Sequence, residues 1–143
     1  QSLRPLIAYG DKFIWHNHSP DYAIKNLVKI LNAFWKAISI IMKPAFDKRD
    51  EYVLQRSVGV FSLHMVLRNM VETIDRARGK IMIYDDYLKI MDGGHYKTLF
   101  SDFWLREKGD DFELRANQFG SMKGFKELAM NIDKDLLENR PRD

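Results

Sequence analysis

The stretch from residue 20 to residue 43 constrains the fold of this chain more than any other. Ser19 suits the N-cap of a helix, and Pro20 suits the first helical position, where a missing N–H has no consequence. Apolar residues then cover most of a helical wheel, namely Tyr22, Ile24, Leu27, Val28, Ile30, Leu31, Phe34, Trp35, Ile38, Ile41 and Met42. We therefore expect one long helix over about 20–43, ended or kinked by Pro44 and covered by neighbours on several sides. The apolar pattern of residues 20–43 predicts a mainly α, compact multi-helix domain with this helix at its centre.

The remaining stripe of this helix is polar and carries lysines. Within residues 20–43, Asp21 is the only acid spaced to pair with one of them at i,i+4. Lysine rows contact phosphates in nucleic-acid binding proteins, and they also form the solvated side of ordinary helices. Two further cations lie beside predicted helix starts, whose free N–H groups suit an anion. The candidate DNA- or anion-binding residues are Lys25, Lys29, Lys36, Lys43, Arg56 and Lys123.

The rest of the sequence predicts further helices joined by short loops. Helical spacing, caps and glycine stops indicate segments at about 2–9, 60–77, 84–91, 95–106 and 121–138, and another start near Asp50. Residues 81–84 fit either a short strand or a helix start, which leaves room for one short β-hairpin or strand pair. Two helix starts also share a pattern at constant offset: Gly59, Val60, Leu63 and Leu67 match Gly124, Phe125, Leu128 and Ile132. This indicates either a weak repeat or two unrelated amphipathic helices.

Composition sets the class of protein. The chain has 143 residues and a net charge of +3, which fits a single helical domain over 1–143 but does not identify a nucleic-acid binder. It begins at Gln1 rather than Met, so we expect a fragment of a longer protein. The lack of cysteine excludes disulfides and thiolate sites. Lysines interrupt the long apolar run and no signal peptide is visible, so we expect a soluble, cytoplasmic chain without a membrane partner.

Catalytic constellations are missing from the sequence. There is no phosphate-binding P-loop, no Gly-x-Ser-x-Gly and no His-Glu-x-x-His motif. Asp85, Asp86 and Asp92 are interpreted as solvated acids near helix ends. We expect a non-catalytic domain without metal or cofactor. The alternative is a small metal-binding or hydrolytic domain that uses the histidines His16, His18, His64 or His95.

Several short motifs suggest a family. They are Arg56-Ser57-Val58-Gly59, Leu63-His64-x-Val66-Leu67, Phe103-Trp104, and Gly120-Ser121-x-x-Gly124 with Leu128. Together they resemble the C-terminal helical part of DGQHR-domain proteins, which are related to the ParB/sulfiredoxin-like fold. Members of that family accompany bacterial DNA-modification and defence systems, including DNA phosphorothioation. The resemblance implies a helical domain that binds DNA or a partner protein in such a system.

The family's signature motif is not intact in this chain. The nearest string, Asp92-Gly93-Gly94-His95-Tyr96, lacks the Gln and the Arg of Asp-Gly-Gln-His-Arg and lies late in the sequence. We interpret it as a chance match, in which case the half that bears the motif and its chemistry is absent here. If the match is real, Asp92 and His95 become site candidates.

Overall fold

The computed structural model describes residues 2–9, 19–72, 84–91, 96–107 and 114–138. The chain is mostly helical and compact, as predicted. In these residues the α-helices are α1 (Arg4–Tyr9), α2 (Pro20–Ile41), α3 (Lys43–Asp47), α4 (Ser57–Met70), α6 (Tyr84–Met91) and α7 (Met122–Glu138). The same residues include the short 3₁₀ turns η3 (Lys97–Leu99), η4 (Ser101–Trp104) and η5 (Ala116–Gln118). Among the described residues none of these helices combines the length and apolar character that crossing a membrane requires.

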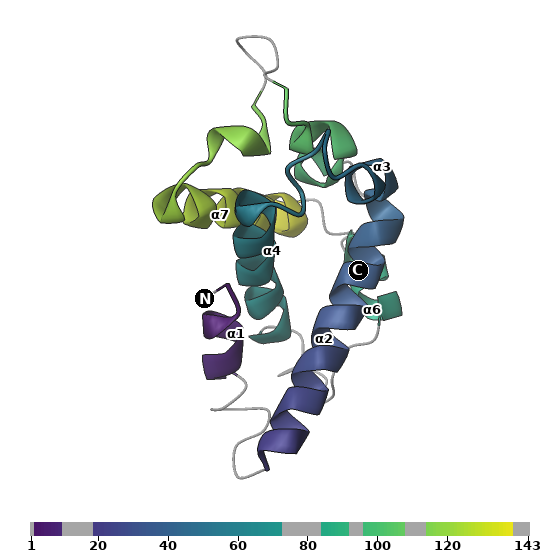
Figure 1. Cartoon of the computed structure of the whole chain (residues 1–143), viewed down its shortest axis with the longest axis vertical. Helices are drawn as coiled ribbons and strands as arrows, with labels where there is room; N and C mark the ends of the chain where they lie inside the picture. Colours follow the sequence, from purple (N-terminus) through teal and green to yellow (C-terminus); the bar gives the residue numbers. More distant parts are fainter. Residues whose placement is uncertain (1, 10–18, 73–83, 92–95, 108–113, 139–143) are drawn as a thin grey trace.

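The long helix α2 runs along one side of the molecule (Figure 1). Its predicted start is confirmed, because the Ser19 hydroxyl accepts a hydrogen bond from the Tyr22 N–H at 3.3 Å. It ends at Ile41, two residues earlier than expected. Pro44 explains the difference, because its ring cannot follow a continuous helix, so the chain turns at Met42 and restarts as α3 with Pro44 in the first turn.

The burial of α2 changes along its length. Its second half supplies core side chains, among them Phe34, Ala37 and Ile38. Several apolar side chains that we expected to be covered are instead exposed: Tyr22, Ile24 and Val28. The expectation of a helix covered on several sides therefore holds only for part of α2. The uncovered part presents a mixed surface to solvent.

Two groups of helices build the core. In one group, α2 packs against α6 and α3; in the other, α4 packs against α7 and α1. Figure 1 shows α7 running crosswise to α4 at the first half of α4. Aromatic side chains support both the first group and the junction: Phe34 meets Tyr87 of α6 edge to face at 5.7 Å, and Trp35 meets His64 of α4 at 5.8 Å.

The two helices whose sequences share a pattern begin in the same way. Gly59 and Gly124 are each the third residue of their helices, α4 and α7. A Cβ on Gly59 would overlap the carbonyl oxygen of Leu54, and a Cβ on Gly124 would lie 2.9 Å from the carbonyl carbon of Phe119. Both contacts reach back five residues along the chain. Glycine is therefore used at both starts because the preceding backbone passes too close for a side chain.

These two helix starts also contact each other. The rings of Phe61 and Phe125 stack with centroids 5.4 Å apart. Beside them the Ser62 hydroxyl donates a hydrogen bond to the Phe125 carbonyl at 3.1 Å. The Ser121 hydroxyl accepts from the Gly124 N–H at 3.3 Å, which confirms the predicted cap of α7. The shared sequence pattern thus corresponds to two helix starts that pack together, of which only that of α7 has a side-chain cap.

Two predicted helices are wrong. Residues 96–104 form η3 and η4, separated by extended backbone at Phe100, rather than one α-helix, and no helix starts near Asp50. Instead these two segments pair with each other, since the Val53 N–H donates to the Trp104 carbonyl and the Arg106 N–H donates to the Glu51 carbonyl, each at 2.8 Å. The result is an antiparallel bridge between Tyr52 and Leu105. It is the only strand-like pairing in the part of the chain that the structure describes; predictions for 73–83 fall outside that part.

Candidate functional site: the exposed face of α2

Three of the predicted site residues lie together on α2. Lys25, Lys29 and Lys36, here called the lysine row, are all exposed. At the rise of an α-helix, about 1.5 Å per residue, the row extends over about 16 Å. Asn32, also exposed, lies between its second and third members. The prediction that these lysines share one face is confirmed, and that face is open to solvent.

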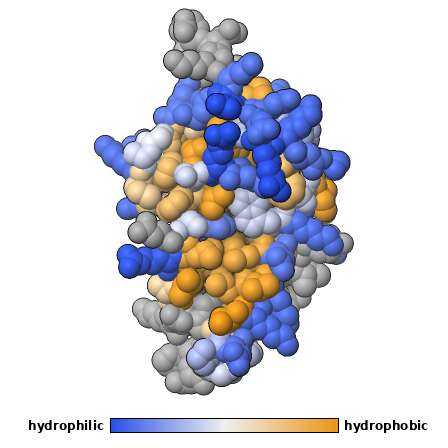
Figure 2. All heavy atoms as spheres, viewed as in Figure 1, coloured by the Kyte–Doolittle hydropathy of each residue, from blue (hydrophilic) through white to orange (hydrophobic). Residues whose placement is uncertain are grey.

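Large apolar side chains border the lysine row on both sides. On the helical wheel Ile24 and Val28 lie on one side of the row, and their exposed fractions are 61% and 48%. Tyr22 and Ile40 lie on the other side, with exposed fractions of 40% and 50%. Figure 2 shows hydrophobic side chains gathered over α2 and the end of α4, next to hydrophilic ones. The exposed face of α2 is therefore cationic along its middle and apolar at its edges.

The other predicted cations lie elsewhere. Lys43 is the first residue of α3, and its Nζ forms an exposed ion pair with Asp47 at 2.8 Å. Arg56 precedes α4 and Lys123 lies in the first turn of α7, both exposed. These two belong to the α4–α7 pair, so the structure does not bring them to the lysine row (Figure 1). The six candidates do not form one site.

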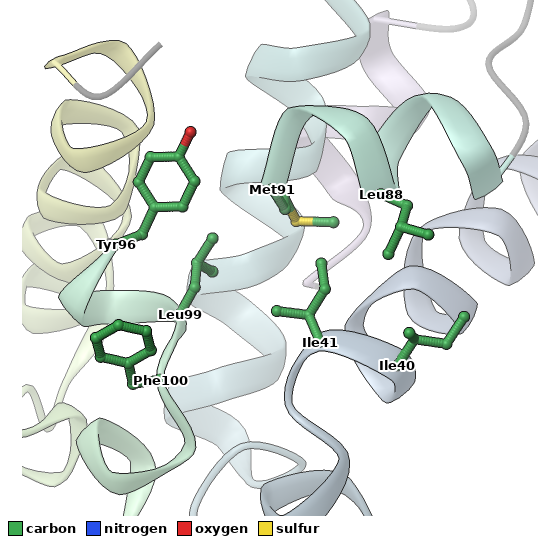
Figure 3. A pocket seen from close by; sticks show the side chains of 7 residues that line it. All are labelled: Ile40, Ile41, Leu88, Met91, Tyr96, Leu99 and Phe100. Carbon is green, nitrogen blue, oxygen red and sulfur yellow. The ribbon is translucent and has the colours of Figure 1, made fainter. Parts of the chain in front are cut away.

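A small pocket lined by large apolar and aromatic side chains, here called the apolar pocket, lies at the C-terminal end of α2. It has a volume of about 300 Å³ and is lined by Ile40, Ile41, Leu88, Met91, Tyr96, Leu99 and Phe100. Figure 3 shows the side chains of Ile41, Leu88 and Leu99 pointing towards a common space. Sequence reasoning missed this pocket, because its lining comes from three segments that only the fold brings together.

His64 is a structural residue in this fold. The indole N–H of Trp35 donates to His64 Nε2 at 3.0 Å, and the Ser2 hydroxyl lies 3.2 Å from Nδ1. Because an indole nitrogen only donates, Nε2 carries no proton, and Nδ1–H donates to Ser2. Burial lowers the pKa of His64 to about 4. A neutral ring with both nitrogens engaged is not placed to act as a general base.

A second polar contact joins α4 to α7. The Asn69 side-chain amide donates to Asp133 Oδ2 at 2.7 Å. Partial burial raises the pKa of the Asp133 carboxyl, and the hydrogen bond from Asn69 opposes that shift. This carboxylate lies at a helix crossing rather than in a pocket that the structure describes.

The described residues offer no metal site. Within them no group of three or more His, Asp or Glu side chains could hold a metal ion. Asp85 and Asp86 lie in the first turn of α6, as expected for acids near a helix start. His16, His18, Asp92 and His95 lie outside the described residues, so the histidine alternative is unsupported at His64 and untested at the others.

Comparisons of the chain with protein-family models, with curated proteins and with solved structures find no match. The resemblance to DGQHR-domain proteins therefore depends on the short motifs alone and stays a prediction. In the structure several of those motif residues have packing roles. Gly59 and Gly124 admit close backbone, Ser121 caps α7, and Trp104 is buried with its indole N–H donating to the Thr98 carbonyl at 2.8 Å.

Proposed function

We propose that this chain is a non-catalytic helical module that binds a partner protein through the exposed face of α2. The observation that carries the proposal is the mixture on that face, where the lysine row runs between exposed apolar side chains such as Ile24 and Val28. A partner protein can cover these apolar side chains with its own and pair its acidic side chains with the lysines. A nucleic-acid backbone would engage the lysines but leave the apolar edges in water. The mixture of lysines and apolar side chains on this face therefore favours a protein over nucleic acid as the binding partner.

The motif resemblance supports the biological setting of the proposal. In that setting the module belongs to a DGQHR-type protein of a bacterial DNA-modification or defence system and works in the cytoplasm, which fits a chain without cysteine. The full-length gene product tests this part. A ParB-like segment with an intact Asp-Gly-Gln-His-Arg motif upstream of these residues is expected, and a gene product without one contradicts the setting.

Site-specific photo-crosslinking in cells tests the binding surface. A photoreactive amino acid at Asn32, within the lysine row, is expected to give a protein adduct. The same amino acid at Lys126, exposed on α7, is the matched control and is expected to give none of that adduct. The adduct should disappear when Lys29 and Lys36 are changed to Glu. Equal adducts at both positions, or adducts that survive the charge reversal, would contradict the proposal.

DNA is the second candidate ligand. The exposure of all three members of the lysine row favours it, because each could neutralise a phosphate. Nucleic acid rather than protein crosslinked at position 32 would support DNA and overturn the protein form.

A further inference from the structure

The lysine row and the apolar pocket lie along one line of the molecule. On the helical wheel of α2, Lys29, Lys36 and Ile40 fall within a narrow stripe. Ile40 follows Lys36 by one turn, about 6 Å along the axis, and is itself part of the pocket lining. A ligand that lies along the row therefore reaches the pocket without leaving the surface of α2.

The pocket has a buried floor and an exposed apolar rim. Met91, Tyr96 and Leu99 are buried, whereas about half of Ile40 and of Phe100 is exposed. In Figure 3 the Tyr96 hydroxyl points away from the other labelled side chains. A volume of about 300 Å³ is at the small end for ligand sites. These features suit one large apolar side chain that is inserted from a partner.

The charge along the approach to the pocket sets the chemistry of that partner. The stripe carries three lysines and one acid, Asp21, which lies at the far end from the pocket. Acidic side chains are the complement of such a row. An α-helix laid beside α2 repeats the same rise, so acids spaced four and seven residues apart would face the three lysines, with an apolar residue four positions further on facing the pocket.

We infer that the lysine row and the pocket form one docking surface for an acidic amphipathic helix of the partner protein, which inserts a large apolar side chain between Ile40 and Phe100. This inference rests on the proposed function and names the chemical class of the partner. A nucleic-acid duplex presents phosphates to a lysine row and keeps its bases stacked inside, so it would use the row without filling the pocket.

Designed peptides test the inference. The probe is a synthetic helical peptide of about five turns with glutamates spaced four and seven residues apart and a leucine four residues after the last, together with its reversed sequence. Binding is measured by fluorescence anisotropy. Replacing the leucine with serine, or Ile40→Ser in the protein, is expected to weaken binding at least about tenfold. Lys36→Glu should weaken binding to the same peptide, and a Glu→Lys peptide should restore it.

Matched variants separate binding from folding. Met130→Ser and Lys126→Glu make comparable apolar-to-serine and charge-reversing changes at exposed positions on α7, and neither should alter peptide affinity. Every variant is expected to keep the helical circular-dichroism spectrum of the unmodified chain. Affinity that ignores the leucine and Ile40, or a dissociation constant weaker than about 1 mM for both peptides, overturns the inference. The crosslink at position 32 would then still decide the proposed function independently.

Discussion

The indole nitrogen of Trp35 donates a hydrogen bond to the unprotonated Nε2 of His64 across 3.0 Å, and the two rings meet edge to face. This contact joins α2 to α4 at the junction of the two helix groups. It also fixes the protonation state of the ring, because a proton on Nε2 would point at another donor. The stability of the fold is thereby coupled to pH.

His64 makes the fold less stable in acid. Its pKa is about 4 in the folded chain and about 6.5 when unfolded, so the unfolded state binds more protons between these values. The contribution of His64 to the free energy of unfolding should be fully present above about pH 6.5 and should fall by roughly 3 kcal/mol as the pH drops towards 4. Below pH 4 the titration of His64 should change the stability little. Thermal melts of the unmodified chain and of His64→Gln, followed by circular dichroism, measure the effect. Parallel pH profiles for the two proteins would contradict it.

Trp35→Phe should remove the donor while keeping most of the ring. Nε2 of His64 then loses its hydrogen bond, at an expected cost of about 1–3 kcal/mol at neutral pH. The pKa of His64 should rise, since protonation no longer meets an opposing N–H. The pH dependence of the melting temperature should therefore flatten as well as shift down. A uniform shift with unchanged pH dependence would show that the indole contributes only packing.

Alanine at the three glycines near helix starts should have graded effects. Gly59→Ala should destabilise by more than about 2 kcal/mol, because its Cβ would overlap the Leu54 carbonyl. Gly124→Ala should cost about 1 kcal/mol, since the nearest backbone atom of Phe119 would be 2.9 Å away and a slight shift relieves it. Gly120→Ala, with nothing within 4 Å, should change stability by less than about 0.5 kcal/mol. Urea denaturation ranks the three; any other order contradicts the close-approach explanation.

Asp133→Asn should stabilise the protein at neutral pH. Burial raises the pKa of this carboxyl, so the folded state loses stability as the pH rises from the unfolded pKa through the folded one. An amide keeps an acceptor for Asn69 without the buried charge. The variant should melt higher than the unmodified chain at pH 7 and equally at pH 3. Asp135→Asn is the control: Asp135 accepts from the Thr98 N–H and hydroxyl, so losing its charge should give no gain.

The DNA alternative has its own signature. Three phosphate contacts predict a slope of about −2.7 for log affinity against log salt, which is roughly a 40-fold loss between 50 and 200 mM. Changing Lys25, Lys29 and Lys36 to Glu should abolish that slope, whereas the same change at Lys89, Lys97 and Lys126, exposed on α6, η3 and α7, should not. Electrophoretic shifts with a short duplex at several salt concentrations measure it. No shift at the lowest salt removes the DNA form.

Sequence motifs predicted those helix ends that depend only on residues adjacent in the sequence. Ser19 with Pro20 marks the start of α2 and Ser121 marks the start of α7, because a cap needs only a side chain and the N–H groups that follow it. The end of α2 was less predictable. Pro44 could either end or kink the helix. In the structure the helix ends before Pro44, and a short new helix follows in which Lys43 forms an ion pair with Asp47.

Nonlocal contacts explain what the sequence did not predict. The helical spacing of Tyr96, Leu99 and Phe103 is real, but Trp104 pairs with Val53 through the backbone and with Thr98 through its indole, which favours short turns over a continuous helix. The lysine row followed from periodicity alone. The pocket beside it did not, because residues 40, 88 and 99 meet only after α6 and η3 pack on α2.

The 3.2 Å contact between Ser2 and His64 has a practical consequence for anyone who expresses this protein. Replacing Ser2 with Ala would leave the Nδ1–H of His64 without this acceptor, so it should lower the melting temperature. Expression designs for the measurements described above should therefore keep Ser2 unchanged.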